Sequence, residues 1–273
     1  MKWVPAPTPI NENRRAQATE KTGIIGTDQV YLFDIYLEIA KDISGYEGGS
    51  FSLYDSKDQC SISCIGLPKE THHKNDKSDS ICSYVLLEKN PLIVFDLKKH
   101  DIFKYHQAVT SGMCHSYCGF PVRNKDGYAL GTFCMLNFTE VKEMSSEKIE
   151  LIEKLVSRLA LQIDTQTEQK EITSQKISKS IDIFIDNYKD FTLSDYKKFI
   201  DICSGLNLPE ENATNLINAN LCEIRNMTVM LSSKGNELQE KMNIVTKIHN
   251  QIKVEGNEAN SLIDNALDKL GDL

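Results

Sequence analysis

Two alternating runs that flank the turn Asn124-Lys125-Asp126-Gly127 constrain the fold of this chain more than any other feature. One run is HSYCGFPVR and the other is YALGTFCML. Alternation of this kind is typical of strands with two different faces, and Asp-Gly tolerates the positive φ that hairpin turns require. The sequence therefore predicts a β-hairpin here, and with it an antiparallel sheet.

The segment from Ser50 to Leu97 supplies the remaining strands of the predicted sheet. FSLYD and QCSISCIGL alternate around the turn Ser56-Lys57-Asp58 and predict a second hairpin. After them, THHKNDKSDS is expected to be a polar loop, and ICSYVLLEKN a short helix that stops at Asn90-Pro91. The run LIVFD is expected to be a strand with both faces covered.

Helical periodicity appears on both sides of these strands. The arm 1–26 is rich in Pro and Gly and is expected to be extended or turn-rich, with a short helix around 11–21. Thr27 is a candidate cap for a helix with Val30, Phe33, Leu37 and Ala40 on one face. A second apolar stripe follows Ser145: Ile149, Ile152, Leu155, Val156, Leu159 and Ile163.

The last hundred residues show helical periodicity and no strand pattern. Thr192, the Asn207-Leu208-Pro209 sequence and Gly235 divide them into four expected helices, 172–191, 193–206, 209–234 and 236–270. These helices could form a compact bundle. Alternatively, the two longest could form an antiparallel pair joined at 233–235, with His249 on the second helix.

Charge and hydropathy exclude several classes of protein. The chain has 31 Lys and Arg against 39 Asp and Glu, a net charge of -8, and no basic patch of the kind that tracks phosphates. It contains no apolar stretch of about 18 residues and no secretory signal pattern. A cytoplasmic protein that binds no nucleic acid and has no membrane span is therefore expected.

The eight cysteines lack the short spacing of zinc sites, and most lie in apolar runs, which favours reduced core thiols. His72 and His73, together with His100 and His106, offer metal-ligating side chains. Adjacent histidines project in different directions, however, and this loop is rich in lysine. We therefore expect no metal site, and the sequence requires no cofactor.

Several motifs together resemble the GAF domains of bacterial signalling proteins. They are NPLIVFDLKKHDIF, HSYCGFPV, and a polar turn followed by GYALGTFCMLN and a Leu- and Ile-rich helix. Pro9, Asn11, Glu12 and Arg14 match an arm of the form P-x-N-E-x-R, and Ile81-Cys82-Ser83 matches the start of the pocket helix. The resemblance covers about residues 9–167. It implies an α+β fold with a five- to six-stranded antiparallel sheet flanked by helices, followed here by an all-α region.

The resemblance also implies a cavity between the sheet and its connecting helices. Its lining would come from Leu53, Ile81, Cys82, Val85, Phe95, Asp96, Phe103, Tyr117, Gly119 and Thr132, or from neighbours one pleat away. The alternative is that these residues fill a core. Asp96 could contact a ligand or could cap the turn that follows it.

GAF domains sense ligands or dimerise, and no kinase, cyclase or ATP-binding motif follows residue 168. We therefore expect an N-terminal arm 1–26, a sensory domain 27–168 and a helical interaction or dimerisation region 169–273. The chain would be a non-enzymatic sensory or scaffold protein that binds an unknown small molecule and captures a protein partner through 170–273. The alternative is a thiol redox enzyme or sensor resembling free methionine sulfoxide reductase, with Cys82, Cys118 and Cys134 as its thiols.

A homodimer is also expected. Its interface would place Val30, Phe33 and Leu37 beside Ile152, Leu155, Leu159 and Ile163. The alternative is that both stripes pack on their own sheet.

Overall fold

The computed structural model describes residues 2–27, 29–67, 74–188 and 190–243. The chain divides into two compact units, Met1–Glu171 and Ile172–Leu273. In the described part, no helix combines the length and the apolarity that crossing a bilayer requires.

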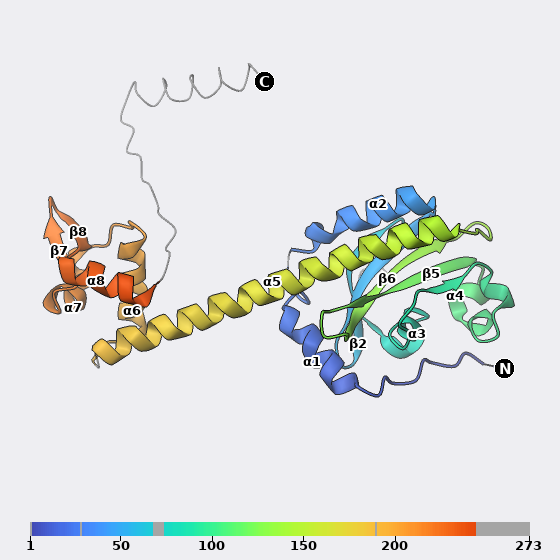
Figure 1. The fold of residues 1–273 in the computed structure, drawn as a ribbon, viewed down its shortest axis with the longest axis horizontal. Coiled ribbons are helices and arrows are strands. Elements are labelled where there is room, and N and C mark those ends of the chain that lie inside the picture. Colours follow the sequence, from blue (N-terminus) through green and yellow to red (C-terminus); the bar gives the residue numbers. More distant parts are fainter. Residues whose placement is uncertain (1, 28, 68–73, 189, 244–273) are drawn as a thin grey trace, which may run out of the picture. The chain divides into compact units, whose positions relative to one another are not determined.

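The first unit is built on one antiparallel sheet of six strands (Figure 1). The strands are β1 (Gly48–Tyr54), β2 (Asp58–Ile65), β3 (Lys74–Asp76), β4 (Leu92–Val94), β5 (Ser116–Arg123) and β6 (Ala129–Asn137), in the order β3-β2-β1-β6-β5-β4. Both predicted hairpins are confirmed as β1 with β2 and β5 with β6, and pairing of β1 with β6 joins them. The run LIVFD forms a three-residue strand at one edge of the sheet. The expected coverage of both its faces is confirmed, because Ile93 packs against the hydrophobic core on one face and Val94 lies in the core on the other.

One face of the sheet is covered by α2 (Asp34–Ser44) and α5 (Ser146–Asn187), which lie side by side in Figure 1. Tyr36 Oη on α2 donates to Gln162 Oε1 on α5 at 2.6 Å. Thr27 does not cap α2, because its hydroxyl instead donates to Ile24 O at 2.8 Å and a 3-10 turn, Gln29–Phe33, comes before the helix. The core beneath includes Phe33, Leu37, Phe51, Leu53, Phe120, Phe133, Ile152, Leu159 and Ile163.

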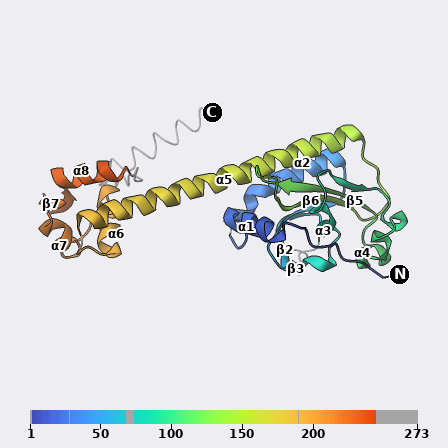
Figure 2. The ribbon, with the colours of Figure 1, turned by 60° about the horizontal axis from the view of Figure 1, so that its bottom comes forward.

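The opposite face is covered by short elements (Figure 2). They are α3 (Cys82–Val85), α4 (Gln107–Thr110) and two 3-10 turns, Leu97–Lys99 and Phe103–Tyr105. A second core lies under them and includes Tyr54, Val85, Leu97, Phe103 and Tyr117. The short helix expected in the arm is confirmed as α1 (Glu12–Thr22), which packs against β1 and β6.

The predicted dimer stripe packs within its own unit. Phe33, Leu37, Ile152, Leu159 and Ile163 are buried in the first core, and Leu155 packs against it; the side chain of Val30 lies outside the described set. The stripe is therefore not an available interface. The apolar side chains that α2 and α5 expose are Ile35, Ile39, Leu151, Leu161, Ile172 and Ile177.

Helix α5 runs for 42 residues through the expected boundary at 168/169, where separate helices were predicted. It contains no Gly or Pro, so nothing in its sequence breaks the helix. The N-terminal part of α5, up to Glu171, belongs to the first unit, and the rest of the helix belongs to the second unit.

In its described part, to residue 243, the second unit packs three further helices and a hairpin around its own core. The elements are α6 (Leu193–Cys203), α7 (Glu210–Asn218), β7 (Cys222–Arg225), β8 (Thr228–Leu231) and α8 (Ser233–Met242). The predicted division at Thr192 is confirmed, because this residue and Asp195 form a capping box at the start of α6.

The expected helix over 209–234 is wrong, and the region is not all-α. Helix α7 ends at Asn218, Asn220 takes a positive φ of 57°, and β7 and β8 form a hairpin. Gly235 does not divide two helices but lies inside α8, where a Cβ would collide with Leu221 O. Leu216, Leu238 and Met242 pack in the third core instead of an antiparallel helix pair. The expected helix beyond residue 243, with His249, lies outside the described residues.

Candidate ligand-binding site

Small polar side chains occupy the centre of the sheet face that α3 covers. Alternation along the strands brings Ser50, Ser52 and Tyr54 of β1 to this face. Register places Ser50 opposite Cys134 and Ser52 opposite Thr132, so β6 adds a thiol and a hydroxyl. All five side chains are buried. A hydroxyl-rich surface thus lies inside an otherwise apolar core.

Most of the residues predicted for the pocket meet at this face. Ile81, Cys82, Val85, Phe103 and Tyr117 belong to the second core, and Thr132 is buried beside it. Gly119 faces the same side, where a Cβ would collide with Tyr117 Oη and Val85. Backbone and ring therefore approach closely here, which only glycine allows.

Three predicted positions lie elsewhere. Leu53 and Phe95 pack in or against the first core, on the opposite face of the sheet. The carboxylate of Asp96 accepts a hydrogen bond from Lys98 N at 3.1 Å and pairs with Lys99 at 2.9 Å, so it caps the turn that follows. Hydrogen bonding to Lys99 lowers the pKa of Asp96.

Two of the three candidate redox thiols lie together in this site. The Sγ atoms of Cys82 and Cys134 are 3.7 Å apart, and Ser50 Oγ lies 3.2 Å from Cys134 Sγ. The hydrogen bond between the two thiols lowers the pKa of Cys82, although its burial acts in the other direction, and raises the pKa of Cys134. Cys118 faces the first core and donates to Tyr46 Oη at 3.4 Å, so it is not part of this pair.

The hydroxyls of Tyr54 and Tyr117 are buried without a hydrogen-bond partner in the described structure. Burial raises the pKa of both, so both remain protonated donors at neutral pH. Polar groups lie nearby all the same: the Tyr117 hydroxyl helps to lower the pKa of Cys82, and the hydroxyls of Ser80, Thr132 and Ser83 oppose the effect of burial on the pKa of Tyr54. Buried polar groups are normally hydrogen-bonded, so two unpaired donors are distinctive.

The N-terminal arm lies over the helices that cover the site. The ring of Trp3 contacts the rings of Tyr84, Phe103 and His106, with centroids 6.0, 6.4 and 4.7 Å away. Trp3 Nε1 donates to Ser78 O at 3.1 Å, and Tyr84 Oη donates to Val4 O at 2.7 Å. This contact was not predicted, although the single Trp of the chain, placed in an arm rich in Pro, was an available signal.

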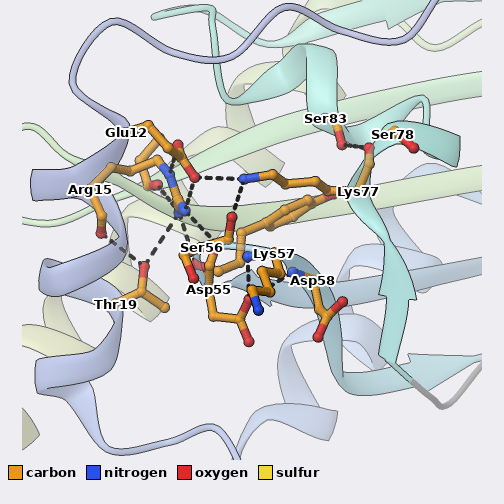
Figure 3. A network of polar contacts seen from close by, with 12 residues as sticks. Glu12, Arg15, Thr19, Asp55, Ser56, Lys57, Asp58, Lys77, Ser78 and Ser83 are labelled. Atoms are coloured by element: carbon orange, nitrogen blue, oxygen red, sulfur yellow. Dashed lines mark hydrogen bonds and ion pairs between the residues drawn. The ribbon is translucent and has the colours of Figure 1, made fainter.

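A buried arginine fixes α1 to the sheet (Figure 3). Arg15 is 1% exposed and donates to Tyr54 O at 2.9 Å and to Asp55 O at 2.8 Å. It also pairs with Glu12 at 2.7 Å, and Lys77 reaches the same carboxylate at 2.7 Å. Arg14, which was matched to the arm motif, is exposed. The residue that anchors the arm is therefore Arg15, which shares a helix face with Glu12 and Thr19 by i+3 and i+4 spacing.

No cluster of three metal-ligating side chains occurs among the residues that the structure describes. All eight cysteines are free thiols, and the two that lie closest to the hydroxyl surface are Cys82 and Cys134. The site can therefore offer hydroxyl donors, two thiols and apolar walls to whatever it contacts.

A six-stranded antiparallel sheet with helices on both faces defines a small α+β domain. Residues 28–163 match the model of the GAF domain, a ligand-binding signalling module. No curated protein matches the chain.

Solved structures similar to the chain share little sequence with it. The GAF domain of Acinetobacter phosphoenolpyruvate-protein phosphotransferase is 14% identical, with 59% of this chain and 93% of that one covered and a TM-score of 0.43. The GAF domain/HD domain protein from Geobacter sulfurreducens is 15% identical, covering 55% and 98%, with a TM-score of 0.42. Type II free methionine-R-sulfoxide reductase from Thermoplasma acidophilum is 14% identical, covering 51% and 92%, with a TM-score of 0.41.

Proposed function

We propose that this protein is a non-enzymatic sensory or scaffold protein of signal transduction. Its GAF domain binds a small polar molecule on the hydroxyl surface under α3, and its second unit binds a protein partner. The observation that carries the proposal is the pair of buried, unpaired hydroxyls of Tyr54 and Tyr117. Leaving a buried donor unpaired costs about 1–3 kcal/mol, and a ligand with acceptor atoms would recover that free energy.

Native mass spectrometry of the purified chain tests the ligand. We expect a fraction of the protein to carry the additional mass of a small molecule, and Tyr117→Phe to reduce that fraction at least severalfold by removing one donor. Tyr46→Phe is the matched control, because Tyr46 is buried on the opposite face and donates to Lys142 O at 2.7 Å. A wild-type spectrum showing only the mass of the bare chain would contradict ligand binding.

The exposed surface of the second unit supports a protein partner. A depression beside α7 is lined by Leu208, Pro209, Ile224, Met227 and Val229, and Met227 is 97% exposed. Glu210 and Glu211, at the start of α7, are exposed and would repel phosphates. A protein partner is therefore favoured over a nucleic acid. Deleting 171–273 is expected to abolish capture of partners in a pull-down, and unchanged capture would contradict this role.

We also propose a cytoplasmic homodimer. Cytoplasmic conditions suit eight cysteines that are all free thiols. The dimer would use the exposed apolar side chains of α2 and α5, such as Ile35, Ile39 and Leu151, in place of the buried stripe. Light scattering at tens of micromolar is expected to give twice the chain mass, and the mass of a single chain would contradict the dimer.

A further inference from the structure

Two buried thiols in the candidate site have no role in the proposed binding of a small polar molecule. Cys82 lies at the start of α3 and Cys134 in the middle of β6, far apart in sequence, yet their Sγ atoms are 3.7 Å apart. Hydroxyls surround the pair, with Ser50 Oγ at 3.2 Å from Cys134 Sγ. Core thiols that serve only as small hydrophobes have apolar neighbours.

We infer that Cys82 and Cys134 are a peroxide-sensitive dithiol that closes to a reversible disulfide inside the GAF domain. This inference rests on the proposed sensory function and names one chemical signal that the same site could receive. It gives a role to two of the three candidate thiols and excludes the third, because Cys118 faces the opposite core.

The environment distinguishes this pair from the other buried cysteines. The thiol–thiol hydrogen bond lowers the pKa of Cys82, with smaller contributions from the hydroxyls of Tyr117, Ser80 and Thr132. Burial instead raises the pKa of Cys118 to about 11 and that of Cys114 to about 12. Because the thiolate is the reactive form, Cys82 is the nucleophile. It is also the more accessible member, 8% exposed against 1% for Cys134.

The chemistry proceeds in two balanced steps with hydrogen peroxide as the oxidant. The Cys82 thiolate attacks one peroxide oxygen, the O–O bond breaks, and hydroxide leaves, so Cys82 becomes a sulfenic acid. The Cys134 sulfur then attacks the Cys82 sulfur, the S–O bond breaks, and water leaves as the disulfide forms. In total, two thiols and one peroxide give one disulfide and two waters. A dithiol reductant reverses the change by thiol–disulfide exchange.

Closing the bond requires movement, because bonded sulfurs lie about 2.05 Å apart. The element that can move is α3, which has four residues, whereas β6 is paired on both sides in the middle of the sheet. Tyr84 of α3 holds the N-terminal arm through its bond to Val4 O and its contact with Trp3. Oxidation would therefore be transmitted from the buried pair to the arm.

Peptide mapping of the full chain tests the inference. The reduced protein is treated with hydrogen peroxide, blocked with an alkylating agent under denaturing conditions, and digested with trypsin. Cleavage gives 78–89 with Cys82 as its only cysteine and 126–142 with Cys134 as its only cysteine. We expect these two peptides joined at the sum of their masses less two hydrogens, and the joined species lost after dithiothreitol.

Three variants complete the test. In Cys134→Ser the sulfenic acid cannot be resolved, so dimedone should label 78–89, whereas in Cys82→Ser it should not label 126–142. Cys118→Ser should give the joined peptide in wild-type amount, and circular dichroism should show each variant folded. Absence of the joined peptide from the oxidised, folded wild type would overturn the inference, as would a linkage of Cys82 to another cysteine.

The outcome is independent of the native mass measurement. A co-purified small molecule without a disulfide would support the sensory function and remove only the dithiol. A disulfide without a co-purified molecule would support the dithiol and contradict only the binding of a small polar ligand.

Discussion

Arg15 connects α1 to the end of β1 through one side chain. Its guanidinium reaches Tyr54 O and Asp55 O at the end of β1 and the carboxylate of Glu12 on its own helix. Because Tyr54 also lines the candidate site, the anchor of α1 and the site share a strand end. Tyr54 therefore links the position of α1 to that of the binding surface, because its carbonyl binds Arg15 and its side chain lines the site.

Replacing Arg15 with Ala is expected to lower the free energy of unfolding by about 3 kcal/mol or more, because buried carbonyls and Glu12 lose their partner. Urea unfolding followed by circular dichroism measures the change. Arg14→Ala is the matched control on the same helix, and because Arg14 is exposed we expect a change within about 0.5 kcal/mol. Equal effects of the two substitutions would contradict the assignment of the anchor to Arg15.

Glu12 makes the same network sensitive to acid. Burial would raise the pKa of Glu12, but hydrogen bonds and the positive charges of Arg15 and Lys77 outweigh it and hold the pKa below its ordinary value of 4.5. The unfolded chain therefore binds the proton more tightly than the folded one. The stabilisation is present above the unfolded pKa and is lost as the pH falls through the folded pKa.

Wild-type stability is thus expected to fall more steeply than that of Glu12→Gln between about pH 5 and pH 3. Urea titrations at several pH values measure both slopes. Identical slopes would show that the Glu12 carboxylate contributes nothing to the acid sensitivity.

At the scale of elements, the sequence predicted strands correctly where residue alternation and turn residues pointed to the same hairpin. Asn124 to Gly127 supplies a hairpin turn between alternating runs, and both hairpins of the sheet were found. Most residues predicted for the pocket share the sheet face under α3, whereas Leu53, whose face depends on strand register, lies on the opposite face. The buried arginine was missed by one position, because a spacing of three or four residues decides which side chain of α1 faces the sheet.

The hairpin of the second unit was missed because its turn has no glycine. Asn226 and Met227 both take positive φ, 50° and 57°, between the paired residues Arg225 and Thr228. Such two-residue turns usually contain Asn-Gly, whereas Met is costly there. The Asn residues at 218 and 220 were the available sign that α7 ends early, since Asn tolerates the left-handed conformation.

Met227→Gly is expected to stabilise the second unit by about 1 kcal/mol, because glycine adopts positive φ without strain. Met227 is 97% exposed, so the loss of its side chain removes few packing contacts within the unit. Met230→Gly is the control, since Met230 is a half-exposed strand residue without positive φ and should lose about 0.5–1 kcal/mol. Thermal unfolding measures both, and a lower melting temperature for Met227→Gly would disprove the strain.

At the scale of the whole molecule, the cores are separate in sequence. The buried residues of the first two clusters all precede residue 164, and those of the third begin at Phe184. The segment of α5 between them is mostly exposed. Each unit therefore has the buried apolar surface that independent folding requires.

A chain that ends at Glu171 is accordingly expected to fold, with the melting temperature of one of the transitions of the full protein. It keeps the bond from Lys170 Nζ to Thr22 O at 2.9 Å and the ion pair of Lys21 with Glu171 at 2.9 Å. A chain that ends at Ile163 is the control. It loses these contacts and also Asp164, whose carboxylate accepts from Lys125 N at 2.8 Å in the β5–β6 turn, so it should melt several degrees lower. Calorimetry of the three chains measures these melting temperatures. A single cooperative transition in the full protein would show that the two units depend on each other for folding. A marked loss of stability on truncation at Glu171 would show the same.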